Sequence, residues 1–366
     1  MILQILLFFE KKGEGQDLTN KGLWCIMNVS DLTTSKQTTC KEQAMKSVYP
    51  LHLSGVTKSP LWGGTKLCRD WGKCSDSPTV GESWELTVRK HEKCRILNGE
   101  HAGKTLDEVI DLWGDALTGG GFGVSDFPLL IKLIDAEDRL SVQVHPDDEN
   151  AGRVENDRGK TEMWYIADAK PGAEIICGLA DGVSAADFAK AVAEGRLEDA
   201  LKHQPVHAGE TYFIPAGLPP AIGKGILIAE IQQNCDRTYR VYDYNRRQAD
   251  GSLRELHVEK ALDVIRPFSN AEINAIRYSR TGGVRTSDAL LAHCDFFRVE
   301  KQILNGAREI STQGKLLHLL CLGGNAALAV DGEHYAIEKG ESWLLPACLN
   351  GVTATGDAAL ILSSVG

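Results

Sequence analysis

The sequence predicts a mainly β protein that contains two related sandwiches or barrels with helical inserts. Short apolar segments separated by Gly and Pro run through most of the chain, and only two segments show a helical period. In addition, the stretch 209–215 is echoed by the stretch 340–346, with the same spacing from Gly to Pro. These observations favour sandwiches or barrels over alternating βαβ units.

Length and charge limit the class of protein. The chain has 366 residues, 43% of them hydrophobic, which is enough to build a sizeable core in one or two domains. Its formal net charge is -10 and no dense run of Lys and Arg occurs, so a nucleic-acid partner is not expected, whereas a small anion is compatible. The 10 cysteines are scattered without C-x-x-C pairs, which indicates reduced thiols in the cytoplasm rather than a disulfide framework.

The beginning of the chain predicts an extension rather than a targeting segment. The apolar run 1–9 lacks a basic region and is too short to cross a bilayer, so we expect neither a signal peptide nor a membrane anchor. Residues 1–44 show no sustained period, and apolar alternation begins after Met45. We expect 1–44 to be a poorly ordered extension or, alternatively, an arm that packs on the domain.

Two helical inserts are expected. Residues 105–116 have apolar side chains at helical spacing and begin with a capping box formed by Thr105 and Glu108. Residues 184–201 form a second amphipathic segment, which begins with a similar box at Ser184. We expect both helices to pack against the sheets rather than to form the functional site.

A smaller β domain is expected over 285–366, after a larger domain over 45–284. The pair Asp331 and Gly332 is a hairpin turn signal within it. Its predicted strands are 296–303, 316–322, 326–330 and 342–345.

One strand carries several polar residues on a single face. In the stretch 140–146, strict alternation places Ser141, Gln143 and His145 on one side and apolar residues on the other. Alternate residues of a strand lie ~6.5–7 Å apart, so Gln143 and His145 reach one ion only in the concave interior of a barrel. The alternative for a strand His beside a Gln is a solvated or hydrogen-bonded pair.

A second strand, 161–166, adds a carboxylate. Glu162 shares a face with Trp164 and Ile166. If this strand pairs antiparallel with the stretch 140–146, Glu162 completes an amide, imidazole and carboxylate set suited to zinc or another borderline divalent ion.

Several short motifs follow one another in order from about Met45 to the end of the chain. They are LWGG at 61–64, GESWE at 81–85, PLLIK at 128–132 with DA at 135–136, LSVQVHP at 140–146, GKTEMWY at 159–165, PAG at 215–217 and YRVYDY at 239–244. Together they resemble the type I mannose-6-phosphate isomerases in their short bacterial form. The resemblance implies a cupin, or jelly-roll, β-barrel fold.

The resemblance also implies roles for seven residues. The metal ligands are Gln143, His145 and Glu162, and the cofactor is Zn²⁺ or another divalent cation. The residues that line the sugar-phosphate pocket are Lys132 and Ser141 for substrate binding and Lys160 and Arg240 for catalysis.

Each pocket residue has a physical rationale and an alternative. A lysine and a hydroxyl suit a phosphate, and Arg240 offers a planar donor fork for a phosphate or a developing oxyanion. The alternative for Arg240 is a surface ion pair with Asp236 or Asp243. The alternative for Lys160, beside Glu162, is an ordinary salt-bridged or phosphate-facing lysine.

The sequence departs from the resemblance in the stretch 217–223. The family pattern there resembles Gly-Thr-Ile-His-Ala-Ile/Leu-Gly, so the fourth metal ligand, a histidine, falls on Pro220. Proline offers no side-chain lone pair. Three protein ligands and a water still hold many catalytic zinc ions, so a weakened site is expected. The other histidines in the neighbourhood, none of them in the motif, are His203, His207 and His257.

The implied activity is the reversible isomerisation of mannose 6-phosphate to fructose 6-phosphate. A proton moves between C1 and C2 through an enediol, and the metal and Arg240 stabilise the oxyanion, while the sequence does not identify the base. Because of Pro220, the activity is expected to be impaired or, as the alternative function, absent in a metal-poor cupin that binds a sugar phosphate without turnover. An epimerase or dioxygenase is disfavoured, since dioxygenases prefer several histidines. The sequence leaves the oligomeric state open.

Overall fold

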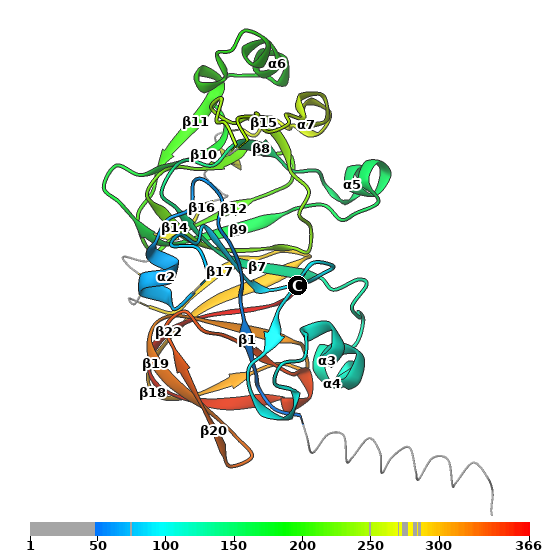
Figure 1. The fold of residues 1–366 in the computed structure, drawn as a ribbon, viewed down its shortest axis with the longest axis vertical. Coiled ribbons are helices and arrows are strands. Elements are labelled where there is room, and N and C mark those ends of the chain that lie inside the picture. Colours follow the sequence, from blue (N-terminus) through cyan, green and yellow to red (C-terminus); the bar gives the residue numbers. More distant parts are fainter. Residues whose placement is uncertain are drawn as a thin grey trace, which may run out of the picture. The chain divides into compact units, whose positions relative to one another are not determined.

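Antiparallel sheets are the main regular structure of the described chain (Figure 1). The computed structural model describes residues 48–366 except 74, 249, 270, 273–276, 281–283 and 285–286. The predicted extension over 1–44 lies outside these residues. Among the described residues, no helix has the length and apolar character needed to cross a membrane.

The first large sheet has seven strands. Their order across the sheet is β16-β12-β9-β14-β7-β3-β2. The strands are β2 (Val56–Lys58), β3 (Glu82–Leu86), β7 (Leu129–Ala136), β9 (Glu162–Ala169), β12 (Glu210–Ile214), β14 (Ile226–Gln233) and β16 (Arg277–Arg280).

Three small sheets accompany it. Strand β8 (Val142–Val144) pairs with β15 (Tyr239–Tyr242), and β10 (Glu174–Leu179) lies between β11 (Leu201–Pro205) and β13 (Pro220–Ile222). The third pair is β4 (Val88–Arg89) with β5 (Glu92–Lys93).

The second large sheet contains the C-terminal strands together with two strands from the beginning of the described chain. Figure 1 shows β1, in blue, beside the orange and red strands, and β1 pairs with β21. The strand order across this second large sheet is β17-β18-β22-β19-β21-β1-β6, with β20 paired to β19. The strands are β1 (Leu51–Ser54), β6 (Arg95–Ile96), β17 (Ala289–His293), β18 (Phe297–Ser311), β19 (Leu317–Val330), β20 (Glu333–Glu338), β21 (Ser342–Leu345) and β22 (Gly351–Val365).

Two strands that the sequence predicts as separate form a single strand in this sheet. The predicted strands 316–322 and 326–330 form one continuous strand, β19, whose register shifts between Cys321 and Gly323. The Gly pair at 323–324 led to the prediction of two strands, whereas β19 continues through the irregularity because β22 pairs on both sides of it. The hairpin turn at Asp331 and Gly332 is confirmed, with φ of 49° and 86°.

The helices are short and lie outside the sheets. The first predicted helix is divided at Gly114 into α3 (Leu106–Trp113) and α4 (Asp115–Thr118), and its capping box is confirmed. The second prediction, 184–201, was too long. Helix α6 (Ala185–Ala193) ends before Gly195, whose φ of 67° is left-handed, and a 3₁₀ turn, Leu197–Ala200, follows. The other α-helices within the described residues are α2 (Lys66–Trp71), α5 (Asp148–Glu155) and α7 (Val258–Val264).

The echoed stretches have the same local structure. Gly209 and Gly340 precede β12 and β21 with φ of 90° and 89°. In each case the following glutamate accepts a hydrogen bond from the aromatic side chain two residues on, Tyr212 Oη at 2.6 Å and Trp343 Nε1 at 3.2 Å. This shared local structure is what two related sandwiches predict.

The central strands of the seven-stranded sheet are buried on both faces. In β7, Leu129, Ile131 and Leu133 belong to a hydrophobic core that includes strands of the second large sheet. Lys132 and Ile134, which alternate with these residues, line a cavity on the opposite side. Strands β9 and β14 alternate in the same way, so this sheet separates the main core from the functional site.

His318 is a buried, unpartnered histidine in β19. Neither ring nitrogen has a hydrogen-bond partner among the described residues, and its side chain is 0% exposed between Leu344 of β21 and Ser363 of β22. Burial, with a smaller contribution from the charge of Lys73, lowers the pKa of His318 to about 3.

We expect this histidine to make the protein sensitive to acid. The unfolded chain binds a proton near the ordinary histidine pKa of ~6.5 and the folded chain does not, so its contribution to stability is complete above that pH and is lost as the pH falls towards 3. Between pH 6.5 and 4.5 the loss should be about 2–3 kcal/mol. Urea unfolding at several pH values should show a shallower acid dependence for His318→Leu. The exposed His334→Leu is the control, and equal slopes for parent and His318→Leu would contradict the prediction.

Candidate active site

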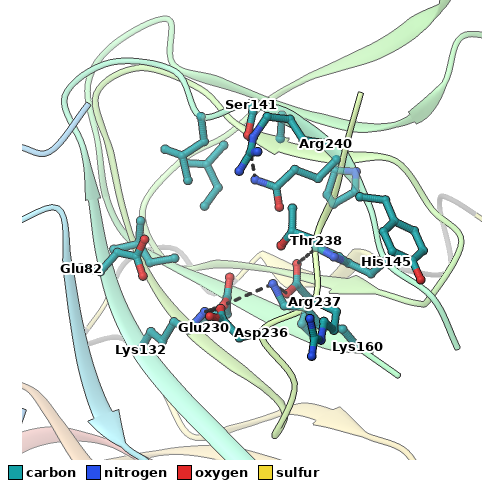
Figure 2. A pocket seen from close by; sticks show the side chains of 18 of the residues that line it. Glu82, Lys132, Ser141, His145, Lys160, Glu230, Asp236, Arg237, Thr238 and Arg240 are labelled. Carbon is teal, nitrogen blue, oxygen red and sulfur yellow. Dashed lines mark hydrogen bonds and ion pairs between the residues drawn. The ribbon is translucent and has the colours of Figure 1, made fainter. Parts of the chain in front are cut away.

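A cavity of about 480 Å³ lies on the face of the seven-stranded sheet opposite the main core (Figure 2). Strands β8, β13 and β15 contribute to its other walls. Every site residue singled out in the sequence lines this one cavity. These residues are Lys132, Ser141, Gln143, His145, Lys160, Glu162 and Arg240.

The strand pairing that the sequence analysis named as a condition for this convergence is not formed. Strand β9, which begins at Glu162, pairs with β12 and β14, whereas β8 pairs with β15. His145 follows β8 and approaches Glu162 across the cavity, with 3.7 Å between His145 Nε2 and Glu162 Oε1. The convergence therefore comes from two sheets that face each other and not from neighbouring strands.

The donor set is compatible with a divalent cation, although it is small. Glu162 Oε1 and the Nδ1 atom of His145 are buried without a hydrogen-bond partner among the described residues, whereas Glu162 Oε2 lies 3.0 Å from Lys160 Nζ. Burial lowers the pKa of His145 well below its usual range, so the imidazole is neutral with a lone pair available. Gln143 lines the same cavity, and its Nε2 donates to Ser141 Oγ at 3.1 Å. In the described part of the chain, no group of three or more His, Cys, Asp or Glu is placed to hold a metal.

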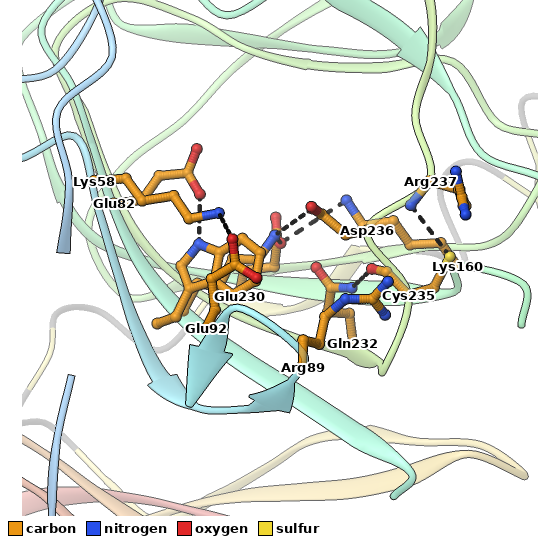
Figure 3. A network of polar contacts seen from close by, with 12 residues as sticks. Lys58, Glu82, Arg89, Glu92, Lys160, Glu230, Gln232, Cys235, Asp236 and Arg237 are labelled. Carbon is orange, nitrogen blue, oxygen red and sulfur yellow. Dashed lines mark hydrogen bonds and ion pairs between the residues drawn. The ribbon is translucent and has the colours of Figure 1, made fainter. Parts of the chain in front are cut away.

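Mostly buried side chains of alternating charge line the cavity and contact one another in a charge network. Figure 3 labels three of them, Lys160, Glu230 and Asp236. Lys160 Nζ lies 3.0 Å from Glu162 Oε2 and 3.9 Å from Glu230 Oε1. Lys132 Nζ lies 3.3 Å from Glu230 Oε1 and 3.9 Å from Asp236 Oδ1. Four of these five side chains, all except that of Asp236, are at most 7% exposed.

Glu230 is a central residue that the sequence analysis missed. It pairs with Lys132 and Lys160, and its Oε2 accepts a hydrogen bond from Trp164 Nε1 at 3.1 Å. A signal was present, because Glu230 is the one acid in the apolar strand 226–233. A buried charge in such a strand needs partners.

The network shifts the pKa values of its members. Burial alone would lower the pKa of Lys160, but Glu162 and Glu230 outweigh this effect and raise it, so Lys160 carries its proton. Burial and the neighbouring carboxylate of Glu230 raise the pKa of Glu162 to about 7. Burial would likewise raise the pKa of Glu230, but the ammonium groups of Lys160 and Lys132 lower it. Lys160 is therefore a proton donor or a fixed positive charge in this arrangement, not a base.

Arg240, on β15, is a cation without a carboxylate partner among the described residues. Asp243 forms hydrogen bonds with Arg254 and Asp236 lies near Lys132, so neither of the two ion pairs considered for Arg240 is formed. Its Nη1 donates to the carbonyl of Glu255 at 2.9 Å, and its Nε is buried without a partner. Burial, and next the charge of Arg254, lower the pKa of Arg240. Such a guanidinium is suited to an anionic ligand.

Pro220, the position where the resemblance places a histidine, also lines the cavity. His257 is on the cavity wall, and its Nδ1 accepts from the backbone N–H of Arg240 at 3.3 Å. His203 lies against Glu174 in a different pocket, and His207 contacts Glu210. These two histidines are therefore not brought to the site.

Two family models match the chain. The model described as "Phosphomannose isomerase type I, catalytic domain" matches residues 51–188, and the model described as "Mannose-6-phosphate isomerase, cupin domain" matches residues 287–365. The predicted cupin fold is thereby confirmed.

Curated proteins and solved structures agree with these matches. The chain is 36% identical over 318 residues to "Mannose-6-phosphate isomerase" from Streptococcus mutans and 37% identical over 316 residues to "Mannose-6-phosphate isomerase ManA" from Bacillus subtilis. Both alignments cover 86% of this chain and 98% of the relative. A crystal structure of the mannose 6-phosphate isomerase from Bacillus subtilis is similar with a TM-score of 0.77 and 34% identity, covering 86% of this chain and 99% of that one. Mutant phosphomannose isomerases from Salmonella typhimurium share the fold at 16% identity, for example with a TM-score of 0.72 over 87% of this chain and 100% of theirs.

Proposed function

The chain belongs to the type I phosphomannose isomerase family, and from this premise we propose that it interconverts mannose 6-phosphate and fructose 6-phosphate. The observation that supports the proposal most is the single cavity lined by all seven predicted residues. This cavity combines a small set of metal donors, a buried protonated lysine and an arginine, Arg240, that has no carboxylate partner among the described residues. The seven described cysteines are free thiols, and we expect the enzyme to act in the cytoplasm.

The phosphate is assigned to the part of the cavity formed by Arg240 and Ser141. Arg240 has donors free of carboxylates, and Ser141 supplies a hydroxyl beside Gln143. Lys132, by contrast, already lies 3.3 Å from Glu230. We therefore assign Lys132 to the hydroxyl groups of the sugar rather than to the phosphate.

The reacting carbons are assigned to the other part of the cavity, next to His145 and Glu162. There Gln143, His145 and Glu162 would hold a divalent cation, Zn²⁺ or another, which when bound polarises the carbonyl oxygen of the sugar. Lys160 supplies a proton and a positive charge beside the oxygen that becomes an oxyanion. The burial of Lys160 and Glu162, which are 7% and 1% exposed, strengthens these charge interactions.

Pro220 favours a second candidate function. With one imidazole fewer, the site has one strong nitrogen donor, one carboxylate and a weak amide. A protein with this site that binds sugar phosphates without turnover would serve as a sensor rather than as an enzyme.

Metal removal and replacement test the two functions. We expect chelator-treated protein to lose activity with mannose 6-phosphate and to regain it with zinc, manganese or cobalt, measured as fructose 6-phosphate formed over time. The isosteric variant Glu162→Gln, assayed in parallel, should lose at least about 100-fold in kcat/KM. Binding of mannose 6-phosphate in calorimetry, without conversion under any of the three metals, would instead establish the non-catalytic function.

A further inference from the structure

The backbone on both sides of Lys160 is held by two side chains that do not line the cavity. The N–H of Gly159 donates to Asp148 Oδ1 at 2.7 Å. The N–H of Thr161 donates to Gln233 Oε1 at 2.8 Å. Lys160 therefore lies between two backbone groups whose positions depend on Asp148 and Gln233.

These two side chains also bind each other. Gln233 Nε2 donates to Asp148 Oδ1 at 3.0 Å, and the backbone N–H of Gln233 donates to the carbonyl of Thr161 at 3.1 Å. Gln233 is only 3% exposed at the end of β14, whereas Asp148 is exposed at the start of α5. Gln233 thus connects the end of β14, the start of α5 and the segment that carries Lys160.

The segment has little freedom to move elsewhere. The N–H of Lys160 donates to the carbonyl of Pro146 at 2.9 Å. A Cβ atom added at Gly159 would lie 2.5 Å from backbone atoms of Asp147 and Asp148, closer than real Cβ atoms come. The three consecutive N–H groups at 159–161 are therefore all bound, two of them to the segment 146–148 and one to Gln233, and at Gly159 only glycine allows such close approach.

We infer that Gln233, together with Asp148, is a positioning residue that holds the ammonium group of Lys160 at Glu162 and Glu230. The inference rests on the role proposed above for Lys160. The side chain of Lys160 is a flexible stem of four carbons. The Nζ atom is therefore held 3.0 Å from Glu162 Oε2 only if the backbone of Lys160 is fixed. A misplacement of ~1 Å in such a group can reduce a rate about 100-fold.

An exchange of donor and acceptor tests this pair. Gln233→Glu has nearly the same shape but turns the donor towards Asp148 into an acceptor, so that two carboxylates face each other. Asp148→Asn then supplies a donor again. In the parent, Asp148 Oδ1 accepts from both the Gly159 N–H and Gln233 Nε2, so in the double variant the new amide nitrogen must donate to residue 233 while the amide oxygen keeps the bond from Gly159. Asp147→Asn is the matched control, because it makes the same change one residue earlier, where asparagine serves equally well as the N-cap of α5.

We expect Gln233→Glu to lower kcat by about 10- to 100-fold while KM changes less than about 3-fold. The double variant should recover to within about 3-fold of the parent, and Asp147→Asn should match the parent. Hydrogen exchange of the peptide that contains 159–161 should be faster in Gln233→Glu and return to the parental rate in the double variant. Parental kcat in Gln233→Glu, or an inactive double variant with parental thermal stability, would overturn the inference.

Two further comparisons keep the test decisive. If Gln233→Glu does not fold, the result depends on the double variant. A folded and active double variant supports the proposed role of the pair, and a folded but inactive one refutes it. If the parent is inactive with every metal, the proposed function fails, whereas the exchange rates at 159–161 still report on the pair. An active parent whose activity is lost in Lys160→Met but unchanged in Gln233→Glu would refute the inference alone.

Discussion

Replacement of Pro220 by histidine is expected to increase both the metal content and the isomerase rate of the protein. Residue 220 lines the cavity that also contains His145 and Glu162, so an imidazole there adds a second strong nitrogen donor. A change of this kind should raise the affinity for zinc at least about 10-fold, since even residues that merely orient a ligand contribute that much. The measurements are metal per chain by mass spectrometry and the rate of fructose 6-phosphate formation.

Pro220→Ala is the control for this substitution. It removes the proline ring from β13 without adding a ligand, so a gain in metal content seen equally in both variants would be due to the backbone and not to the imidazole. If Pro220→His binds no more zinc than Pro220→Ala, the cavity does not place residue 220 next to the cation, and the weakened-site explanation is wrong.

Lys160→Met should be the most damaging single change in the charge network. Methionine keeps most of the volume of the lysine but leaves Glu162 and Glu230 buried with less compensating charge. Removing one partner of a buried pair typically destabilises a protein by about 3–5 kcal/mol. Loss of the proton donor should also reduce kcat about 10²- to 10⁴-fold.

The stability effect is measured by urea unfolding with a chelator present, so that added metal does not replace the missing charge. Lys170→Met is the matched control, because Lys170 pairs with Glu137 on the surface, where the two side chains are 47% and 51% exposed. That change should cost ~0–1 kcal/mol and leave activity unaltered. An unfolding free energy of Lys160→Met equal to that of the control would show that the network contributes little to the folded state.

The sequence predicted which residues line the cavity more reliably than how the strands that carry them pair. Period-two alternation identified the faces that carry Gln143, His145 and Glu162, because the side-chain direction in a strand depends only on neighbouring residues. It did not identify the strand partners. Pairing of β8 with β15 joins segments about 100 residues apart, and no local pattern encodes that choice.

The errors in element length have a similar origin. Gly195 interrupts the second helix because a left-handed residue ends it, although the apolar stripe continues beyond it. In β19 the opposite occurred, because pairing with β22 carried the strand past a glycine pair. Glu230 was missed although it is the one acid of its strand, because its partners, Lys132 on β7 and Lys160 just before β9, lie far from it in the sequence. The division into domains at 284 and 285 stays a prediction.

The place of β1 in the second large sheet affects how the protein is made on the ribosome. Its residues Leu51, His52 and Leu53 pair with β21, about 290 positions later. At an elongation rate of ~5–20 residues per second, the nascent chain waits about 15–60 s before that partner emerges. During this interval β6 is already available for one edge of β1, whereas the edge that later pairs with β21 has no partner strand and stays open until translation is nearly finished.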